Sequence, residues 1–207
     1  MIIVGIDMSK NSPGVCVRED EKITFMSFIR GSETKRNTAH FTALREKGVH
    51  ITFNPRSTKV KEYSELEIWK IEDASLLAKS IVSQLPDHVD MVGIEGFSYG
   101  SKGNSGLDIA GYAYCVRKEL FEKYGKKMCV FAPSNVKKTA GKGNAGKPEI
   151  MKFFLESQEP DLQNNAFWKG LSKKEINEEK PVDDLVDAYY VQECTRQHYL
   201  SQLIDTI

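Results

Sequence analysis

With 207 residues, 40% of them hydrophobic and 28% charged, the chain has the length and composition of one globular domain, expected to span residues 1–207. Its 29 basic and 29 acidic residues cancel, so the net charge by itself gives no sign of a nucleic-acid partner. No apolar run approaches the roughly 20 residues that span a bilayer, and the first residues resemble no secretory signal, so we expect no membrane partner and a cytoplasmic location.

The first 30 residues predict a three-stranded antiparallel meander, because three apolar runs are separated by short polar turns. The predicted strands cover residues 2–7, 15–17 and 23–29. The segment 31–64 is polar, basic and weakly patterned, and we treat it as an insertion with one predicted strand at 49–53. Apolar residues at helical spacing then predict a helix over 66–85, which ends before Pro86.

The second half of the chain alternates predicted strands and helices, with glycine-rich loops at 96–106 and 140–147. Strands are predicted at 91–94 and 128–131, helices at 109–124, 148–155 and 181–199, and a short helical turn at 134–139. Residues 157–180 form a second insertion without a clear pattern. Strands first, followed by alternation, predict an α/β fold with a mixed central sheet flanked by helices.

Cysteine and histidine are scattered along the chain and form no C-x-x-C pair or zinc-ligand spacing. We therefore expect free, buried thiols in a reducing compartment such as the cytoplasm, and no zinc site. The residues concerned are Cys16, Cys115, Cys129, Cys194, His40, His50, His88 and His198.

Acidic side chains end two predicted strands and begin the last predicted helix. Asp7 and Glu95 end the strands, while Asp184 and Asp187 are three residues apart and share one helix face. Brought together, these carboxylates would repel one another unless hard divalent cations neutralised them. The sequence therefore predicts a site in which they bind two magnesium ions, with manganese as a substitute, and in which a phosphodiester is hydrolysed.

Simpler explanations exist for most of these acids. An acid after a strand is commonly a loop residue, which is the alternative for Asp7. Asp183 and Asp184 follow Pro181 closely, where acids stabilise a helix N-terminus. Asp187 lies one turn further into the helix among apolar neighbours, so capping does not explain it.

The charges are unevenly distributed along the chain, although they sum to zero. Residues 117–147 hold nine basic and two acidic residues, and residues 30–61 hold eight basic and two acidic residues. Residues 149–207 hold six basic and twelve acidic residues. Glycines in the loop 140–147 let the backbone approach a phosphate, and the nearby lysines supply charge. We predict DNA contacts here from Lys137, Lys138, Lys142 and Lys147. A flexible surface connector is the alternative, whereas a P-loop is excluded because Pro148 follows Lys147.

The glycine-rich stretch after Glu95 is a second predicted DNA contact. Lys102 supplies charge, and Phe97 and Tyr99 are aromatic side chains that can stack on unpaired bases. Core packing is the alternative for both aromatic residues.

Several motifs, in this order, resemble RuvC-type Holliday junction resolvases, and especially their phage- and poxvirus-encoded branches. G-I-D at 5–7 and G-I-E at 93–95 end strands, and D-D-L-V-D-A at 183–188 begins a helix. Between them, V-K-K at 136–138 leads into G-x-G-x-A-x-K at 141–147, as in that family. The resemblance covers roughly residues 1–30, 66–155 and 181–195.

The resemblance implies an RNase H-like fold and a magnesium-dependent crossover junction endodeoxyribonuclease, acting as a homodimer that makes paired nicks in four-way DNA during recombination and repair. It implies that the metal ligands are Asp7, Glu95, Asp184 and Asp187, and that Lys147, with Lys137, contacts the scissile phosphate. A phage origin is expected, and with it the cytoplasm of a bacterium or an infected host.

Other functions remain open on the sequence. A general branched-DNA debranching enzyme or another RNase H-like nuclease, such as one that cuts RNA–DNA hybrids, would use the same carboxylates. A non-catalytic junction-binding protein is a third option. Actin-like ATPases also begin with G-I-D, but they need two such domains, for which 207 residues leave little room.

Overall fold

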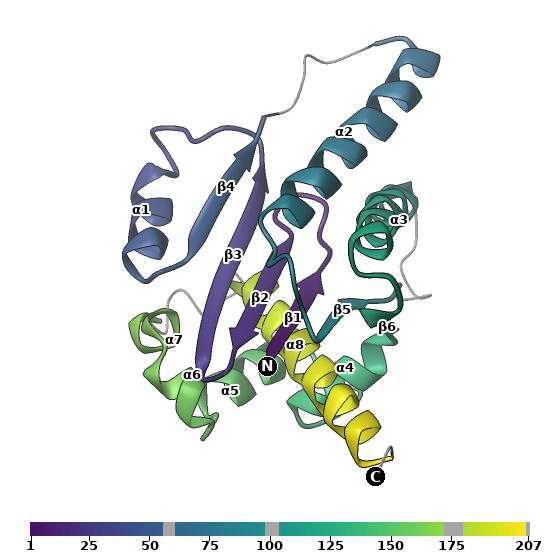
Figure 1. The fold of residues 1–207 in the computed structure, drawn as a ribbon. Coiled ribbons are helices and arrows are strands. Elements are labelled where there is room, and N and C mark those ends of the chain that lie inside the picture. Colours follow the sequence, from purple (N-terminus) through teal and green to yellow (C-terminus); the bar gives the residue numbers. More distant parts are fainter. Residues whose placement is uncertain (56–60, 98–103, 172–179, 206–207) are drawn as a thin grey trace.

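The computed structural model describes residues 1–55, 61–97, 104–171 and 180–205, and its centre is a six-stranded sheet with helices on both faces (Figure 1). The strand order is β4-β3-β2-β1-β5-β6. The strands are β1 (Ile2–Asp7), β2 (Gly14–Glu19), β3 (Lys22–Arg30), β4 (His50–Asn54), β5 (Met91–Glu95) and β6 (Met128–Phe131).

The sheet combines an antiparallel meander with three parallel strands, as predicted. β1, β2 and β3 pair in antiparallel order, while β4 joins β3, β5 joins β1 and β6 joins β5 in parallel. Parallel strands carry their carboxyl ends to the same edge of a sheet. The last residues of β1 and β5 therefore lie at one edge.

Alternation of side chains along the strands divides the core into two layers. Val4 and Ile6 of β1 pack with α2 (Tyr63–Ser83) and α3 (Asn104–Tyr124) on one face. Cys16 and Phe25 of β2 and β3 pack on the other face with α5 (Lys147–Leu155) and α8 (Val182–Ile204). The chain is thus layered as helices, sheet and helices.

Helix α8 lies directly against the meander because two glycines leave room for its backbone. A Cβ atom on Gly5 would lie 2.1 Å from the backbone nitrogen of Gln192, and one on Gly14 would lie 2.3 Å from the carbonyl oxygen of Asp184. Only glycine fits at such distances. This contact brings the acidic start of α8 to the strand edge where Asp7 lies.

Both segments treated as insertions contain regular structure. The described part of 31–64 contains α1 (Thr38–Glu46) and strand β4, and α1 buries Phe41 and Leu44 on the face that α8 covers. The described part of 157–180 contains α6 (Pro160–Asn164) and α7 (Ala166–Gly170) where irregular structure was expected. Two helices of five residues each are too short to show helical periodicity.

The remaining helices follow the prediction with shifted ends. The predicted turn at 134–139 is α4 (Pro133–Ala140), a short 3₁₀ helix η1 (Gly125–Lys127) follows α3, and α8 continues beyond residue 199 to Ile204. All four cysteines are free thiols, two of them buried and two partly exposed. Within the described ranges, no helix is both long and apolar enough to cross a bilayer.

Candidate active site

The ends of β1 and β5 place two acidic side chains side by side. Parallel pairing aligns Ile6 with Ile94, so Asp7 and Glu95 follow at the next step of neighbouring strands. Asp7 is only 8% exposed, whereas Glu95 is partly exposed. Burial raises the pKa of Glu95, although a hydrogen bond with Asp7 and the charges of nearby lysines oppose that rise.

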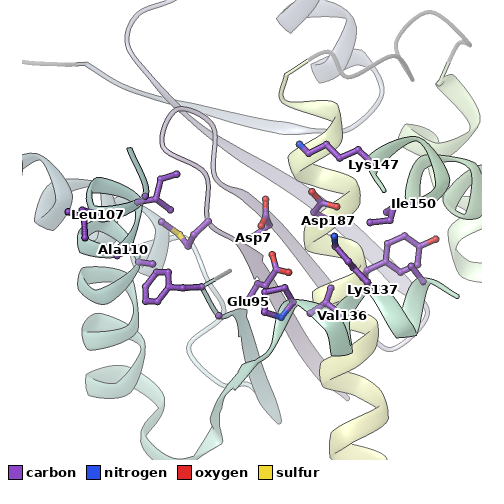
Figure 2. Close-up of a pocket in the computed structure, with 18 residues that line it drawn as sticks. Asp7, Glu95, Leu107, Ala110, Val136, Lys137, Lys147, Ile150 and Asp187 are labelled. Atoms are coloured by element: carbon purple, nitrogen blue, oxygen red, sulfur yellow. The ribbon is translucent and has the colours of Figure 1, made fainter. Parts of the chain in front are cut away.

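Helix α8 adds a third carboxylate to this edge. Asp187 lines a cavity of about 810 Å³ together with Asp7 and Glu95, and Figure 2 shows the three carboxylates near one another at its centre. Asp184 lies one turn earlier in the helix and does not line this cavity. The structure therefore brings three of the four predicted carboxylates into one cavity.

The fourth carboxylate, Asp184, is held by groups from the chain itself. Its side chain is 2% exposed and accepts hydrogen bonds from the hydroxyls of Ser9, at 3.1 Å, and of Ser12, as well as from the Lys180 ammonium. Its charge still raises the pKa values of Asp7 and Asp187. Asp184 thus belongs electrostatically to the acidic cluster but does not line the cavity.

The carboxylates are held in an environment that penalises their charge. Burial, followed by the charges of Asp187, Asp184 and Glu95, raises the pKa of Asp7 well above its usual range. Burial likewise raises the pKa of Asp187 to about 7, with Lys147 opposing the rise and the neighbouring carboxylates adding to it. A cation placed among these oxygens would stabilise the charged carboxylates against both burial and their mutual repulsion.

The donor chemistry of this cavity fits a hard divalent cation. The acidic side chains that line it offer only carboxylate oxygens, and sites with oxygen donors alone suit Mg²⁺ or Mn²⁺. Among the residues that the structure describes, no group of three or more His, Cys, Asp or Glu side chains is placed so that it could hold a metal ion. The side chains of the cavity thus fit such an ion by their chemistry, and their present spacing does not form a coordination sphere.

Two predicted lysines line the same cavity. Lys137 of α4 and Lys147, the first residue of α5, both lie on its wall, and Figure 2 shows the Lys137 side chain reaching toward Glu95 and Asp187. The Lys147 ammonium donates to Oδ2 of Asp183 at 2.5 Å. The Glu149 carboxylate accepts a hydrogen bond from the Gly146 N–H at 2.9 Å, which fixes the turn that carries Lys147.

The other predicted DNA-contacting lysines lie elsewhere. Lys138 lines a second cavity of about 560 Å³ beside Cys194 and His198. Lys142 is exposed in the glycine-rich loop and lines neither cavity. Lys102 and Tyr99 are outside the described residues.

Phe97 lines the main cavity but is engaged by α3. Its ring centroid lies 5.5 Å from that of Tyr114, and the Arg117 guanidinium lies 4.4 Å from the centroid of Phe97. Arg117 also donates to the Glu95 carbonyl oxygen at 3.3 Å. Arg117 thereby links Phe97 to the end of β5, a contact that sequence patterns did not indicate.

Sequence patterns also missed the partners of the acidic helix start. Lys180 lies in the turn just before α8 and pairs with both Asp183 and Asp184 in the first turn of that helix. The sequence feature that could have indicated this pairing is Lys180, a lysine three residues before Asp183 and four before Asp184. Ser9 and Ser12 lie in a turn whose only sequence signal was its polarity.

Comparisons with known proteins identify the fold. No protein-family model and no curated protein matches the chain. Among solved structures, Thermus thermophilus RuvC in complex with a Holliday junction substrate matches with a TM-score of 0.51 and 14% identity, covering 98% of this chain and 96% of that chain. A second Thermus thermophilus RuvC structure matches at the same identity and coverage with a TM-score of 0.45. The chain therefore has the RNase H-like fold of RuvC, with its mixed sheet between layers of helices.

Proposed function

We propose that this protein is a magnesium-dependent endonuclease that cuts four-way DNA junctions and acts as a homodimer making paired nicks. One observation carries the proposal: Asp7, Glu95 and Asp187 share one cavity with Lys137 and Lys147, at the carboxyl edge of an RNase H-like sheet. The likeness to a RuvC structure determined with a Holliday junction substrate supports a branched substrate.

The side chains of the cavity divide the work of hydrolysis. Asp7, Glu95 and Asp187 would hold the metal, with Asp184 behind them stabilising the cluster through its serine and lysine contacts. A divalent ion bound there supplies positive charge for the transition state and a water of lowered pKa. Because the ligands must be deprotonated, binding of the ion and loss of protons from Asp7 and Asp187 are linked.

The lysines would bind the substrate. Lys137 and Lys147 face the carboxylates across the cavity, so they would offset the repulsion between the acidic cluster and the phosphates of DNA. Lys147, which Asp183 holds in place, would contact the scissile phosphate. Phosphate contacts of this kind position DNA without reading its sequence.

The proposal is tested by incubating the purified protein with a labelled synthetic four-way junction, with and without Mg²⁺, beside linear duplex and Y-shaped controls. We expect paired symmetric nicks in the junction only, and only with the metal present. Cleavage of every branched substrate would replace junction resolution by general debranching. Tight junction binding without cleavage would indicate a non-catalytic binding protein.

The dimer requires a separate measurement. Sedimentation equilibrium of the protein alone and of its complex with the junction should give two copies of the chain per junction. A single copy bound, with one nick per junction, would contradict the paired-nick mechanism while leaving the nuclease activity intact.

A further inference from the structure

Two lysines share one buried carboxylate beside the candidate active site. The ammonium groups of Lys147 and Lys180 lie 2.5 Å and 3.0 Å from the same oxygen, Oδ2 of Asp183. Asp183 is only 4% exposed, and its other oxygen, Oδ1, is buried without a hydrogen-bond partner among the described residues. Lys180 pairs with Asp184 as well.

Two ammonium groups converge on one oxygen of Asp183, although repulsion between like charges opposes this arrangement. Together they offset the charges of two buried carboxylates, because Lys180 also pairs with Asp184. The two lysines also come from different elements, Lys147 from the start of α5 and Lys180 from the residues that precede α8. The result is a pair of half-exposed ammonium groups held close together, and one phosphate can bridge such a pair.

Both ammonium groups remain available to a ligand. The side chains of Lys147 and Lys180 are 48% and 50% exposed, and an ammonium group has three N–H donors. The Lys147 ammonium donates a hydrogen bond to Asp183, and the Lys180 ammonium donates one to Asp184. Each ammonium group therefore keeps N–H donors beyond the one in its hydrogen bond, on a side chain that is half exposed.

Their position places that anion at the reaction centre. The charge of Lys180 acts on Asp7, and the charge of Lys147 acts on Glu95 and Asp187, so the lysine pair lies within electrostatic reach of the three carboxylates of the cavity. The His40 ring contacts the Lys180 carbonyl oxygen at 3.0 Å, which ties the backbone of Lys180 to α1. The segment 31–64 thereby helps to place this lysine.

We propose that Lys147 and Lys180 together form a two-ammonium site for one DNA phosphate, and that Asp183 is the positioning residue that holds both groups beside the cavity. The inference rests on the proposed nuclease function and deepens it, because it adds Lys180 and Asp183 to the residues that bind the substrate. Asp183 acts through the lysines and contacts neither metal nor DNA.

The first test measures DNA binding without metal. A fluorescent four-way junction is titrated in EDTA over a series of KCl concentrations, with wild-type protein, Lys180→Gln and Lys118→Gln. Lys118 is the matched control, because it pairs with Glu122 at the same i,i+4 spacing as Lys180 with Asp184 and lies outside the cavity. Each phosphate contact contributes about 0.9 to the slope of log K against log salt.

We expect Lys180→Gln to reduce that slope, by at most about 0.9 because Lys147 still faces the same phosphate, and Lys118→Gln to leave it unchanged. Lys180→Arg should restore the slope, because the guanidinium keeps the charge and the reach to a phosphate. A slope for Lys180→Gln equal to that of the wild type would overturn the two-ammonium site.

The second test concerns Asp183. Asp183→Asn removes one negative charge, so DNA binding should be equal or tighter, whereas cleavage at saturating DNA should slow about tenfold because the two ammonium groups lose their anchor. Thermal unfolding and circular dichroism establish that the variant is folded. Cleavage at the wild-type rate would remove the positioning role, and if Asp183→Asn does not fold, the Lys180→Gln slope still decides the phosphate site.

The outcomes separate this inference from the function on which it rests. Failure of the wild-type protein to bind any DNA in low salt would overturn both. Salt-dependent binding and magnesium-dependent cleavage by the wild type, with Lys180→Gln identical in slope, would overturn the inference alone.

Discussion

Asp7 and Glu95 occupy the same step of two neighbouring parallel strands, one residue beyond the aligned pair Ile6 and Ile94. Their proximity is therefore a property of the backbone register, which side-chain rotation changes little. Asp187 reaches the same place from a helix whose backbone touches Gly5 directly. The acidic cavity is thus built on two rigid contacts, strand with strand and strand with helix.

Replacing Asp7 by Asn should abolish metal-dependent cleavage while the protein stays folded. A metal contributes several kcal/mol to phosphodiester hydrolysis, and each 1.4 kcal/mol is a factor of ten, so we expect a loss of more than about 100-fold. DNA binding should be kept or become tighter, because one negative charge beside the phosphate is removed. Single-turnover cleavage and metal-free binding measure the two effects.

Asp20→Asn is the control for that experiment, because Asp20 is an exposed turn residue at a positive φ, which Asn tolerates. It should cleave at the wild-type rate. If Asp7→Asn lost DNA binding together with cleavage, the assignment of Asp7 as a metal ligand would fail.

Without metal, the stability of the fold should depend on the protonation of Asp187. The folded state raises the pKa of this group from 3.8 to about 7, so the folded protein binds its proton more tightly than the unfolded chain does. Ionising Asp187 therefore destabilises the folded state. This loss of folding stability is absent below about pH 4, grows as the pH rises to about 7, and is complete above that pH.

Urea unfolding in EDTA at several pH values measures this effect. Asp187→Asn lacks the titrating group, so the variant should gain stability relative to the wild type as the pH rises from about 4 to about 7. Adding Mg²⁺ at pH 8 should stabilise the wild type and have a smaller effect on the variant. A stability difference that is independent of pH would contradict the raised pKa.

Most of the fold could be predicted because its central elements carry strong local patterns. The apolar run ending at Asp7, the one ending at Glu95 and the helical spacing over 66–85 each determine an element by themselves. Helices α6 and α7 are held by tertiary contacts, since Leu162 and Phe167 are buried in the core that α8 shares. Local periodicity cannot report contacts of that kind.

The residues of the candidate site could be predicted where their type and their position in a strand or helix indicate metal binding. Contacts between distant segments could not be predicted in this way. Asp7, Glu95 and Asp187 follow from acids at strand ends and on an apolar helix face. Asp184 does not line the cavity and accepts a hydrogen bond from Ser12, which lies 172 residues away in the chain, and no local pattern links the two. The packing of Phe97 against Arg117 is likewise a contact between separate elements.

Gly5→Ala should damage both the fold and the site. The new Cβ would lie 2.1 Å from the Gln192 nitrogen and 2.5 Å from the Ala188 carbonyl oxygen, so α8 must move away from β1. Overpacking against backbone atoms costs about 3 kcal/mol, and the shift also moves Asp187 away from Asp7. We expect a lower free energy of unfolding in urea and much slower cleavage.

Gly111→Ala provides the matched control, since a Cβ at this position in α3 meets no atom within 4 Å. Alanine favours a helix over glycine by about 1 kcal/mol, so this variant should be as stable as the wild type or more so, and fully active. Wild-type stability and activity in Gly5→Ala would show that α8 does not depend on this contact.

Arg18→Met should strongly destabilise the protein, although Arg18 lies outside the candidate site. The Arg18 side chain is 3% exposed and joins three carboxylates, those of Glu159 at 3.1 Å, Asp161 at 2.5 Å and Glu193 at 3.0 Å, which links β2 with α6 and α8. Removing one partner of a buried ion pair leaves unpaired charge, which costs about 3 kcal/mol or more.

Arg45→Met is the comparison that separates burial from charge. Arg45 also donates two hydrogen bonds to a carboxylate, that of Glu33, at 3.0 Å each, but both side chains are substantially exposed. Water replaces such an exposed pair at little cost, so we expect no measurable change in the urea midpoint. Equal losses in the two variants would mean that the buried network around Arg18 contributes nothing beyond an ordinary surface ion pair, and that apolar packing alone holds α6 against β2 and α8.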